Sequence, residues 1–225
     1  KRFVSSAGTE TDAPPPVALP PVDGLTYDLA YACRKRYSPE SDFVPGQVGV
    51  RDVAALLKEA IASYAYRNDL DESAEHARPR VCLYTVLHGV EGIPDGAYRY
   101  DSAAHALRRV RSGDFRRLLQ GGMALNNVNL FRVPICLHVV GDKNHLKAEL
   151  GYRGYRIAQM EAGMLVQRIL LAASAVGMGG HPLLDFDADL CDRLYNLAPL
   201  GATCLIQVPV GRLRHRPRLE GSLHG

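Results

Sequence analysis

Residues 151–182 read GYRGYRIAQMEAGMLVQRILLAASAVGMGGHP, and this stretch decides the fold. From Ile157 to Val176 it is apolar nearly all round, which predicts a long helix that is buried on most sides. Glu161 and Gln167 interrupt the apolar run, and a buried carboxylate needs a partner. The glycine turn at residues 177–180 predicts where the helix ends.

The bulk composition is that of an ordinary globular protein. The chain has 225 residues, of which 47% are hydrophobic and 23% charged, and its formal net charge is +3. This length allows one substantial core or two small ones. The charge is too small and too scattered for a nucleic-acid binder, so we expect no nucleic-acid partner. Glu161 and Arg168 make the long apolar helix a poor membrane span, so we expect no membrane partner.

The cysteines predict a reducing compartment. Their count is odd and their spacing fits neither a zinc site nor a disulfide framework; they are Cys33, Cys82, Cys136, Cys191 and Cys204. Buried, reduced thiols of this kind favour a cytoplasmic protein. His138 lies in a strand-like apolar run, and we interpret it as a satisfied core or interface histidine.

The first 24 residues differ in composition from the rest of the chain. Residues 1–24 are rich in Pro, Ser and Ala, which predicts a linker or N-terminal arm and a chain that is one part of a longer polypeptide. We expect one domain over residues 25–216 and a tail at 217–225.

Hydrophobic periodicity predicts an α+β fold with a mainly antiparallel central sheet flanked by helices. Besides the long helix, we expect helices at 25–40, 48–64, 114–127 and 187–197. We expect strands at 80–90, 97–101, 106–110, 130–142 and 202–211.

Four segments carry a resemblance to a known family. They are RKRYSPESDF (34–43) with VRDVAALL after it, GIPDGAYRYDSAAHAL (92–107), RGYRIAQMEAGMLVQRILLAASAVGMGG (153–180) and LIQVPVG (205–211). Their order resembles the nitroreductase-like flavoproteins, most closely the SagB/thiazoline-oxidase branch, which contains azoline dehydrogenases of peptide pathways. The third segment is the most specific.

The resemblance implies a nitroreductase-like fold that binds FMN between two subunits. The partner would be an identical chain or a tandem copy of the domain, and the long helix would lie at the dimer interface beside the flavin. Glu161 would then pair with an arginine, for which Arg153, Arg156 and an arginine of the partner chain are candidates. The alternative is a purely structural ion pair.

The family's opening and its glycine turn suggest residues that bind the cofactor. Arginine suits the FMN phosphate because its planar fork donates two charge-assisted hydrogen bonds. By resemblance, Arg34, Arg36 and Ser38 would contact the phosphate or ribityl chain; a basic surface turn is the alternative. The resemblance also places Met178, Gly179 and Gly180 against the isoalloxazine ring, and a simple helix C-cap is the alternative.

Two more cofactor contacts follow from the resemblance. The loop ESAEHARP (72–79) resembles a flavin loop of the family, with Ser73 as its contact and Glu75 where the family has glycine. A basic residue after the last strand often closes the phosphate site. Here it would be Arg212, Arg214 or Arg216, and we take Arg216.

The sequence departs from the azoline dehydrogenases at the catalytic position. These enzymes carry a Lys-Tyr pair just before the RGYR segment, but this chain has Glu149 and Leu150 there. The base would then be Tyr152, Glu149 or Lys147, or a residue of a partner domain.

The resemblance implies an FMN-dependent dehydrogenase that oxidises thiazoline or oxazoline rings to azoles in a peptide natural-product pathway. The ring would pass a hydride to flavin N5, and O₂ would reoxidise the flavin. The partner would be a peptide substrate or a carrier-bound intermediate. One alternative is a degenerate domain that recognises a peptide or serves as a scaffold. The other is an NAD(P)H-dependent nitro or quinone reductase.

Overall fold

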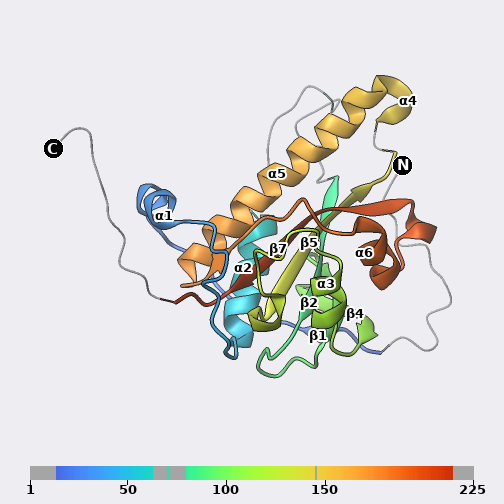
Figure 1. Cartoon of the computed structure of the whole chain (residues 1–225). Helices are drawn as coiled ribbons and strands as arrows, with labels where there is room; N and C mark the ends of the chain where they lie inside the picture. The colour runs from blue at the N-terminus through green and yellow to red at the C-terminus, as the bar shows by residue number, and fades with distance from the viewer. Residues whose placement is uncertain (1–13, 63–69, 71–79, 145, 215–225) are drawn as a thin grey trace.

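The computed structural model describes residues 14–62, 70, 80–144 and 146–214 (Figure 1). Its helices are α1 (Leu29–Lys35), α2 (Val50–Ala62), α3 (Arg116–Gly121), α4 (Lys147–Leu150), α5 (Tyr152–Ala175) and α6 (Ala188–Tyr195). Two short 3-10 turns are η2 (Leu130–Arg132) and η3 (Ala198–Leu200). Its strands are β1 (Val17–Ala18), β2 (Val81–Leu87), β3 (Gly96–Asp101), β4 (Ala106–Ser112), β5 (Ile135–Asp142), β6 (Gly179–Gly180) and β7 (Ala202–Gly211).

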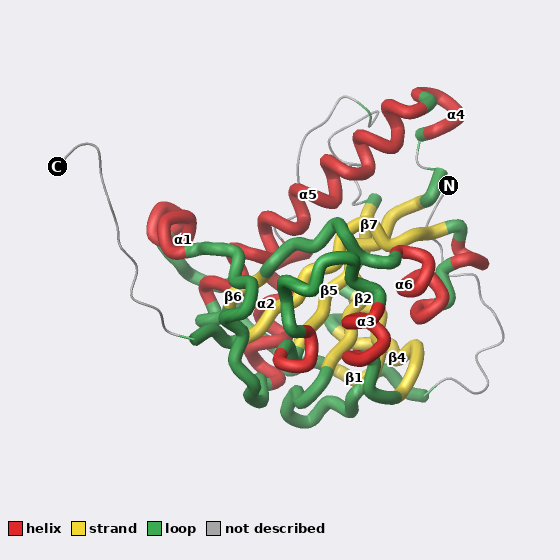
Figure 2. Tube along the Cα trace, in the orientation of Figure 1, coloured by secondary structure: helices red, strands yellow, loops and turns green. Residues whose placement is uncertain are grey.

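The described strands form one sheet with helices on both faces, as Figure 2 shows. The order is β1-β4-β3-β2-β5-β7-β6, and each neighbouring pair is antiparallel. This confirms the predicted α+β class and its antiparallel sheet. The sequence did not predict β1 or β6, because a strand of two residues is too short to show a period.

Two predicted helices are shorter than expected. α1 begins after Asp28, whose side chain accepts a hydrogen bond from the Tyr31 N–H. It ends before Arg36, which is already extended; the Ser38-Pro39 pair that follows favours extended backbone. α3 ends at the Gly121-Gly122 pair, because glycine is a poor helix former. The predicted helix at 187–197 forms as α6, with Asp187 as its N-cap.

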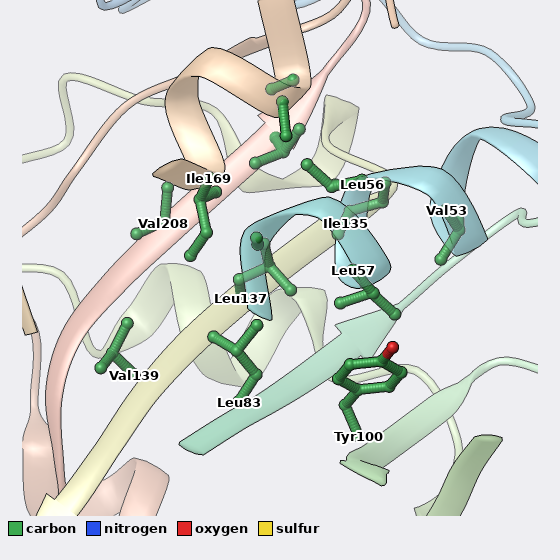
Figure 3. Close-up of a cluster of buried hydrophobic side chains, with 14 of the residues drawn as sticks. Val53, Leu56, Leu57, Leu83, Tyr100, Ile135, Leu137, Val139, Ile169 and Val208 are labelled. Carbon is green, nitrogen blue, oxygen red and sulfur yellow. The ribbon is translucent and has the colours of Figure 1, made fainter. Parts of the chain in front are cut away.

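One face of the sheet packs against α2 and α5. Figure 3 shows strand residues Leu83 and Leu137 facing Leu57 of α2, with Ile169 of α5 close by. All four are buried, at most 1% exposed. Each such side chain stabilises the fold by roughly 1.5–3 kcal/mol relative to exposure.

The other face of the sheet packs against α3 and α6. Successive β5 side chains point to opposite faces, so Leu137 joins the first core and Cys136 joins the second. Burial raises the pKa of Cys136 well above its usual range, so this thiol stays protonated.

His138 of β5 is fully buried in this second layer. The Tyr195 hydroxyl lies 2.8 Å from Nδ1, and Nε2 lies 3.0 Å from Oε1 of Gln207. Burial raises the pKa of Tyr195 well above its usual range, so the phenol stays protonated and donates to Nδ1. The proton on Nε2 is then donated to Gln207. The interpretation of His138 as a satisfied core histidine is confirmed.

The long helix, α5, differs from the prediction in its burial. Its inner face is buried on the sheet and on α2. Its outer face is exposed in this chain, because nothing described in the chain covers it. Large apolar side chains stand on that face: Tyr152 is 87% exposed, Met160 68% and Met164 38%. We call these three residues, with Gly163 on the same side of the helix, the outer stripe of α5.

The partner of Glu161 is Arg80. Glu161 is 3% exposed, and its Oε1 lies 2.6 Å from Nη1 of Arg80. Arg153 and Arg156 are exposed, so the two arginines named from within the helix are not the partners. Arg80 stands one residue before β2, so the ion pair ties the start of that strand to the middle of α5.

In the part of the chain that the structure describes, no helix combines the length and the apolarity needed to cross a bilayer.

We expect Glu161→Ala to lower the free energy of unfolding by about 3 kcal/mol, because it leaves Arg80 partly buried without this carboxylate. Urea unfolding monitored by circular dichroism measures the change. The matched control is Arg80→Met with Glu161→Met, which removes both charges and should cost less than Glu161→Ala. A loss below about 1 kcal/mol for Glu161→Ala would show that the pair is not a structural tie.

Candidate functional site

Three segments that are far apart in sequence meet at one edge of the sheet. The edge strand β6 pairs with the end of β7, Gly179 opposite Gly211. Beyond Gly211 the chain continues in contact with residues 42–44: the Val44 N–H donates to the Arg212 carbonyl at 3.0 Å, and the Arg214 N–H donates to the Asp42 carbonyl at 2.8 Å. Residues 42–44 at the end of the arginine-bearing opening, the glycine turn and residues 212–214 are therefore neighbours.

The predicted phosphate contacts stand at the end of α1. Arg34 belongs to its last turn, Arg36 follows it, and Ser38 lies two residues further on. Arg34 and Ser38 are exposed and Arg36 is half-buried. Basic side chains in the last turn also interact favourably with the negative end of the helix dipole. They therefore stabilise α1 whether or not they bind a phosphate. α1 contacts α5, which keeps it at the same end of the long helix as β6.

The glycine turn ends α5 in the manner of a Schellman motif. Gly177 has a φ of 73°, a conformation that favours glycine. The Met178 N–H donates to the Ala173 carbonyl at 2.8 Å, and the Gly177 N–H donates to the Ser174 carbonyl at 3.1 Å. The Met178 side chain is buried in the first core. Only the backbone of Met178 is therefore left to face a ligand.

The two glycines of β6 are closely packed by leucine side chains of the chain itself. A Cβ on Gly179 would lie 2.5 Å from Cδ1 of Leu213, and one on Gly180 would lie 2.8 Å from Cδ2 of Leu170. Because the His181 N–H donates to the Pro209 carbonyl, and bonded and non-bonded pairs alternate in an antiparallel ladder, the Gly180 N–H and C=O point away from β7. A planar ring on this side of β6 would face the backbone N–H and C=O of Gly180.

Two residues near this edge were missed by the sequence reading. His181 directly follows Gly180, and its Nδ1 is buried without a hydrogen-bond partner among the described residues. Arg168 of α5 likewise has a buried Nε without such a partner there. Burial raises the pKa of the Tyr27 phenol, and the Glu59 carboxylate raises it further. The Arg168 guanidinium lowers the same pKa and so offsets part of the rise. Arg168 therefore lies beside the entry to α1. The signal available in the sequence was an arginine inside an otherwise apolar helix.

The three candidate bases stand at the opposite end of α5. Lys147 and Glu149 belong to α4, and Tyr152 is the first residue of α5. All three are exposed. At about 1.5 Å per residue, Tyr152 and the end of α5 are about 35 Å apart. Figure 1 shows α4 and α1 at opposite ends of the helix. A single chain therefore does not bring these bases to β6.

Two predicted contacts lie outside the described residues. These are Ser73, in the loop after α2, and Arg216, after β7. Arg212 and Arg214 are described, and both are exposed.

The comparisons with known proteins agree with this architecture. The sequence model of the Nitroreductase family matches residues 46–212. The chain belongs to the nitroreductase family. A nitroreductase-family protein of Methanocaldococcus jannaschii is 25% identical over 130 residues, which cover 58% of this chain and 64% of that protein.

Solved structures show the nitroreductase fold. A nitroreductase-family structure from Anabaena variabilis has a TM-score of 0.69 at 24% identity and covers 83% of this chain and 38% of that one. The chain thus matches less than two thirds of the length of these first two relatives. A chain of the E. coli microcin synthetase McbBCD complex, with truncated pro-MccB17 bound, has a TM-score of 0.62 at 18% identity and covers 96% of this chain and 85% of that one.

We expect Gly179→Ala to destabilise this nitroreductase-family domain by about 1–3 kcal/mol, because Leu213 would have to move away from the new methyl group. Adding Leu213→Ala should recover part of the loss. Gly121→Ala is the matched control, since a Cβ at Gly121 meets nothing within 4 Å. Thermal unfolding measures all three variants. An unchanged stability in Gly179→Ala would contradict the close packing of β6 on the chain after β7.

Proposed function

We propose that this chain is an FMN-dependent dehydrogenase that oxidises thiazoline or oxazoline rings in a peptide to azoles. The observation that carries the proposal is the convergence, at one sheet edge, of the three family segments predicted to hold the cofactor. Membership of the nitroreductase family supports FMN as the cofactor. The similarity to a chain of a complex that has a pro-peptide bound supports a peptide as the substrate.

The residues at the β6 edge fit FMN. Arg34 and Arg36 offer forked donors for the phosphate, and the Nε of Arg168, which has no hydrogen-bond partner among the described residues, offers a further donor. The outward-facing peptide group of Gly180 offers a donor and an acceptor to the ring. When bound, FMN would accept a hydride at N5 and be reoxidised by O₂.

The chain's own part of the chemistry is to place the ring and to take a proton. An azoline becomes an azole by losing a hydride and a proton, so a base must face the ring carbon that keeps no hydrogen. Tyr152, Glu149 and Lys147 are the proposed bases because all three are exposed at one end of α5. The Lys-Tyr pair typical of azoline dehydrogenases is absent from this position, so one of these side chains would take its place.

A second chain is needed to complete the site, and we propose a homodimer or a tandem-domain dimer. The bases and the β6 edge are about 35 Å apart in one chain. If two copies of α5 packed antiparallel about a two-fold axis, the bases of one chain would approach the β6 edge of the other. The outer stripe of α5 supports this arrangement, because exposed Tyr152, Met160 and Met164 place apolar side chains on one side of the helix.

Two other functions fit particular observations. The absent Lys-Tyr pair favours a degenerate domain that binds a peptide or completes a dimer. The similarity to nitroreductase-family proteins favours NAD(P)H-dependent reduction of a nitro compound or quinone. A protein that takes up no FMN would support the first alternative. Rapid NAD(P)H oxidation by nitro compounds, without azoline oxidation, would support the second.

We expect the purified protein to bind FMN and Arg34→Ala with Arg36→Ala to weaken that binding at least about tenfold, since each phosphate contact is charge-assisted. Titration of the apoprotein with FMN, followed by flavin fluorescence, gives both dissociation constants. Arg51→Ala is the matched control, because Arg51 is an exposed arginine of α2. If the double variant and the control bind FMN equally well, these two arginines do not hold the phosphate.

We expect two inactive variants to restore activity when mixed. One carries Arg34→Ala and Arg36→Ala, and the other carries Lys147→Ala, Glu149→Gln and Tyr152→Phe. In an equal mixture of freely exchanging dimers, about a quarter of the sites would hold both intact halves. Azoline oxidation is measured before and after co-refolding. A mixture that stays inactive although size-exclusion chromatography shows heterodimers would contradict a site shared between chains.

A further inference from the structure

A groove of about 830 Å³ lies on the face of the sheet opposite α5. It runs between α6 and the start of α3, and it reaches the end of β4 and the turn after β5. Phe115, Leu118, Leu190 and Leu194 give it an apolar lining. Leu118 is 42% exposed, so part of this apolar surface is in contact with water. The groove has the size of a ligand site and lies away from the candidate cofactor edge.

Three cations stand around this lining: Arg111 of β4, Lys143 after β5 and Arg193 of α6. All three are exposed, and within the described ranges none of them forms an ion pair. The groove also holds two carboxylates. Asp192 accepts a hydrogen bond from the Cys204 N–H at 2.7 Å, so it already serves the protein's own backbone.

Asp189 is the other carboxylate, and it lies in the first turn of α6. A carboxylate in a first turn is favoured by the positive end of the helix dipole. The three cations therefore outnumber the carboxylates, and they surround apolar side chains. A ligand that matches this surface carries negative charges and apolar groups together.

We propose that the groove binds an acidic segment of the peptide substrate, with leucine-like side chains on the apolar lining and carboxylates at the three cations. β4 pairs with β1 only at Leu107 and Ala106. Arg111 therefore stands on a stretch of edge strand that no described strand covers. Such an edge offers backbone groups to an extended peptide, which favours a peptide over a compact small molecule. The inference rests on the proposed function in naming the substrate as the occupant.

The groove lies close to the proposed bases in the chain. Lys143 comes four residues before Lys147, so their Cα atoms are at most about 14 Å apart. A peptide held at Lys143 can therefore place a ring a few residues further along near the start of α5. The groove would hold the substrate by a segment that does not react, which raises the local concentration of the reacting ring.

The test uses a fluorescein-labelled peptide of alternating Glu and Leu and measures its anisotropy with the full chain. We expect saturable binding that weakens as salt rises from about 50 to about 500 mM. Arg111→Glu with Arg193→Glu should weaken binding on the order of tenfold, since like charges then face the peptide. The matched control is Arg51→Glu with Arg132→Glu, which makes the same charge change at exposed residues outside the groove.

Two more comparisons separate the apolar and charged contributions. Leu118→Asp should weaken binding of the Glu/Leu peptide, and a Glu/Ser peptide should bind less tightly than the Glu/Leu peptide. Equal weakening by the groove variant and the matched control would overturn the proposal, because it would mean unspecific attraction. Equal binding of the two peptides, or no binding at all, would overturn it as well.

The FMN content of the same samples separates this inference from the proposed function. A protein that binds FMN but not the Glu/Leu peptide would reject the groove as a peptide-binding site and leave the proposed dehydrogenase function in place. A protein that binds the peptide through Arg111 and Arg193 but takes up no FMN would keep the groove and reject the dehydrogenase.

Discussion

The burial of one face of α5 on the sheet is the constraint on which the rest of the molecule depends. Small side chains at Ala158, Ala162 and Ala173, all at most 5% exposed, allow the helix to lie close to the strands. The ion pair between Glu161 and Arg80 fixes its position along the start of β2. Because the helix is long, its two ends cannot both line the same site within one chain. Each end therefore carries a different part of the candidate site.

The same sheet separates two kinds of interior. Alternation along β5 sends Leu137 toward α5 and His138 toward α6. The first interior is apolar, while the second contains a hydrogen-bonded line from Tyr195 through His138 to Gln207. The hydroxyl of Tyr195, both ring nitrogens of His138 and the Oε1 of Gln207 are hydrogen-bonded, so this line can fix the position of α6 on the sheet. The groove is formed by the solvent-facing side of the layer that contains α3 and α6.

The sequence was sufficient for the parts of the fold that depend on local pattern. The strands expected at 80–90, 130–142 and 202–211 are long apolar runs, and all three are present as β2, β5 and β7. β5 begins five residues later than expected, because residues 130–132 form the 3-10 turn η2. The sequence was insufficient where a contact between residues far apart in the chain determines the structure. Arg80 and Glu161 are 81 residues apart, and the contact between residues 42–44 and 212–214 has no local signal. The resemblance indicated which segments belong to the candidate site. Only the backbone contacts in the structure show that three of these segments lie at one edge of the sheet.

The strand β7 has a consequence for the order in which the domain can fold. It is the last of the described strands, yet it lies between β5 and β6 and then runs on beside residues 42–44. The arginine-bearing opening is synthesised long before residues 212–214, with which Phe43 pairs at Leu213. Contacts of such long sequence separation form slowly. The edge that would receive the cofactor is therefore expected to be completed last, and a nascent chain would pass through a stage with a formed helix layer and an open sheet.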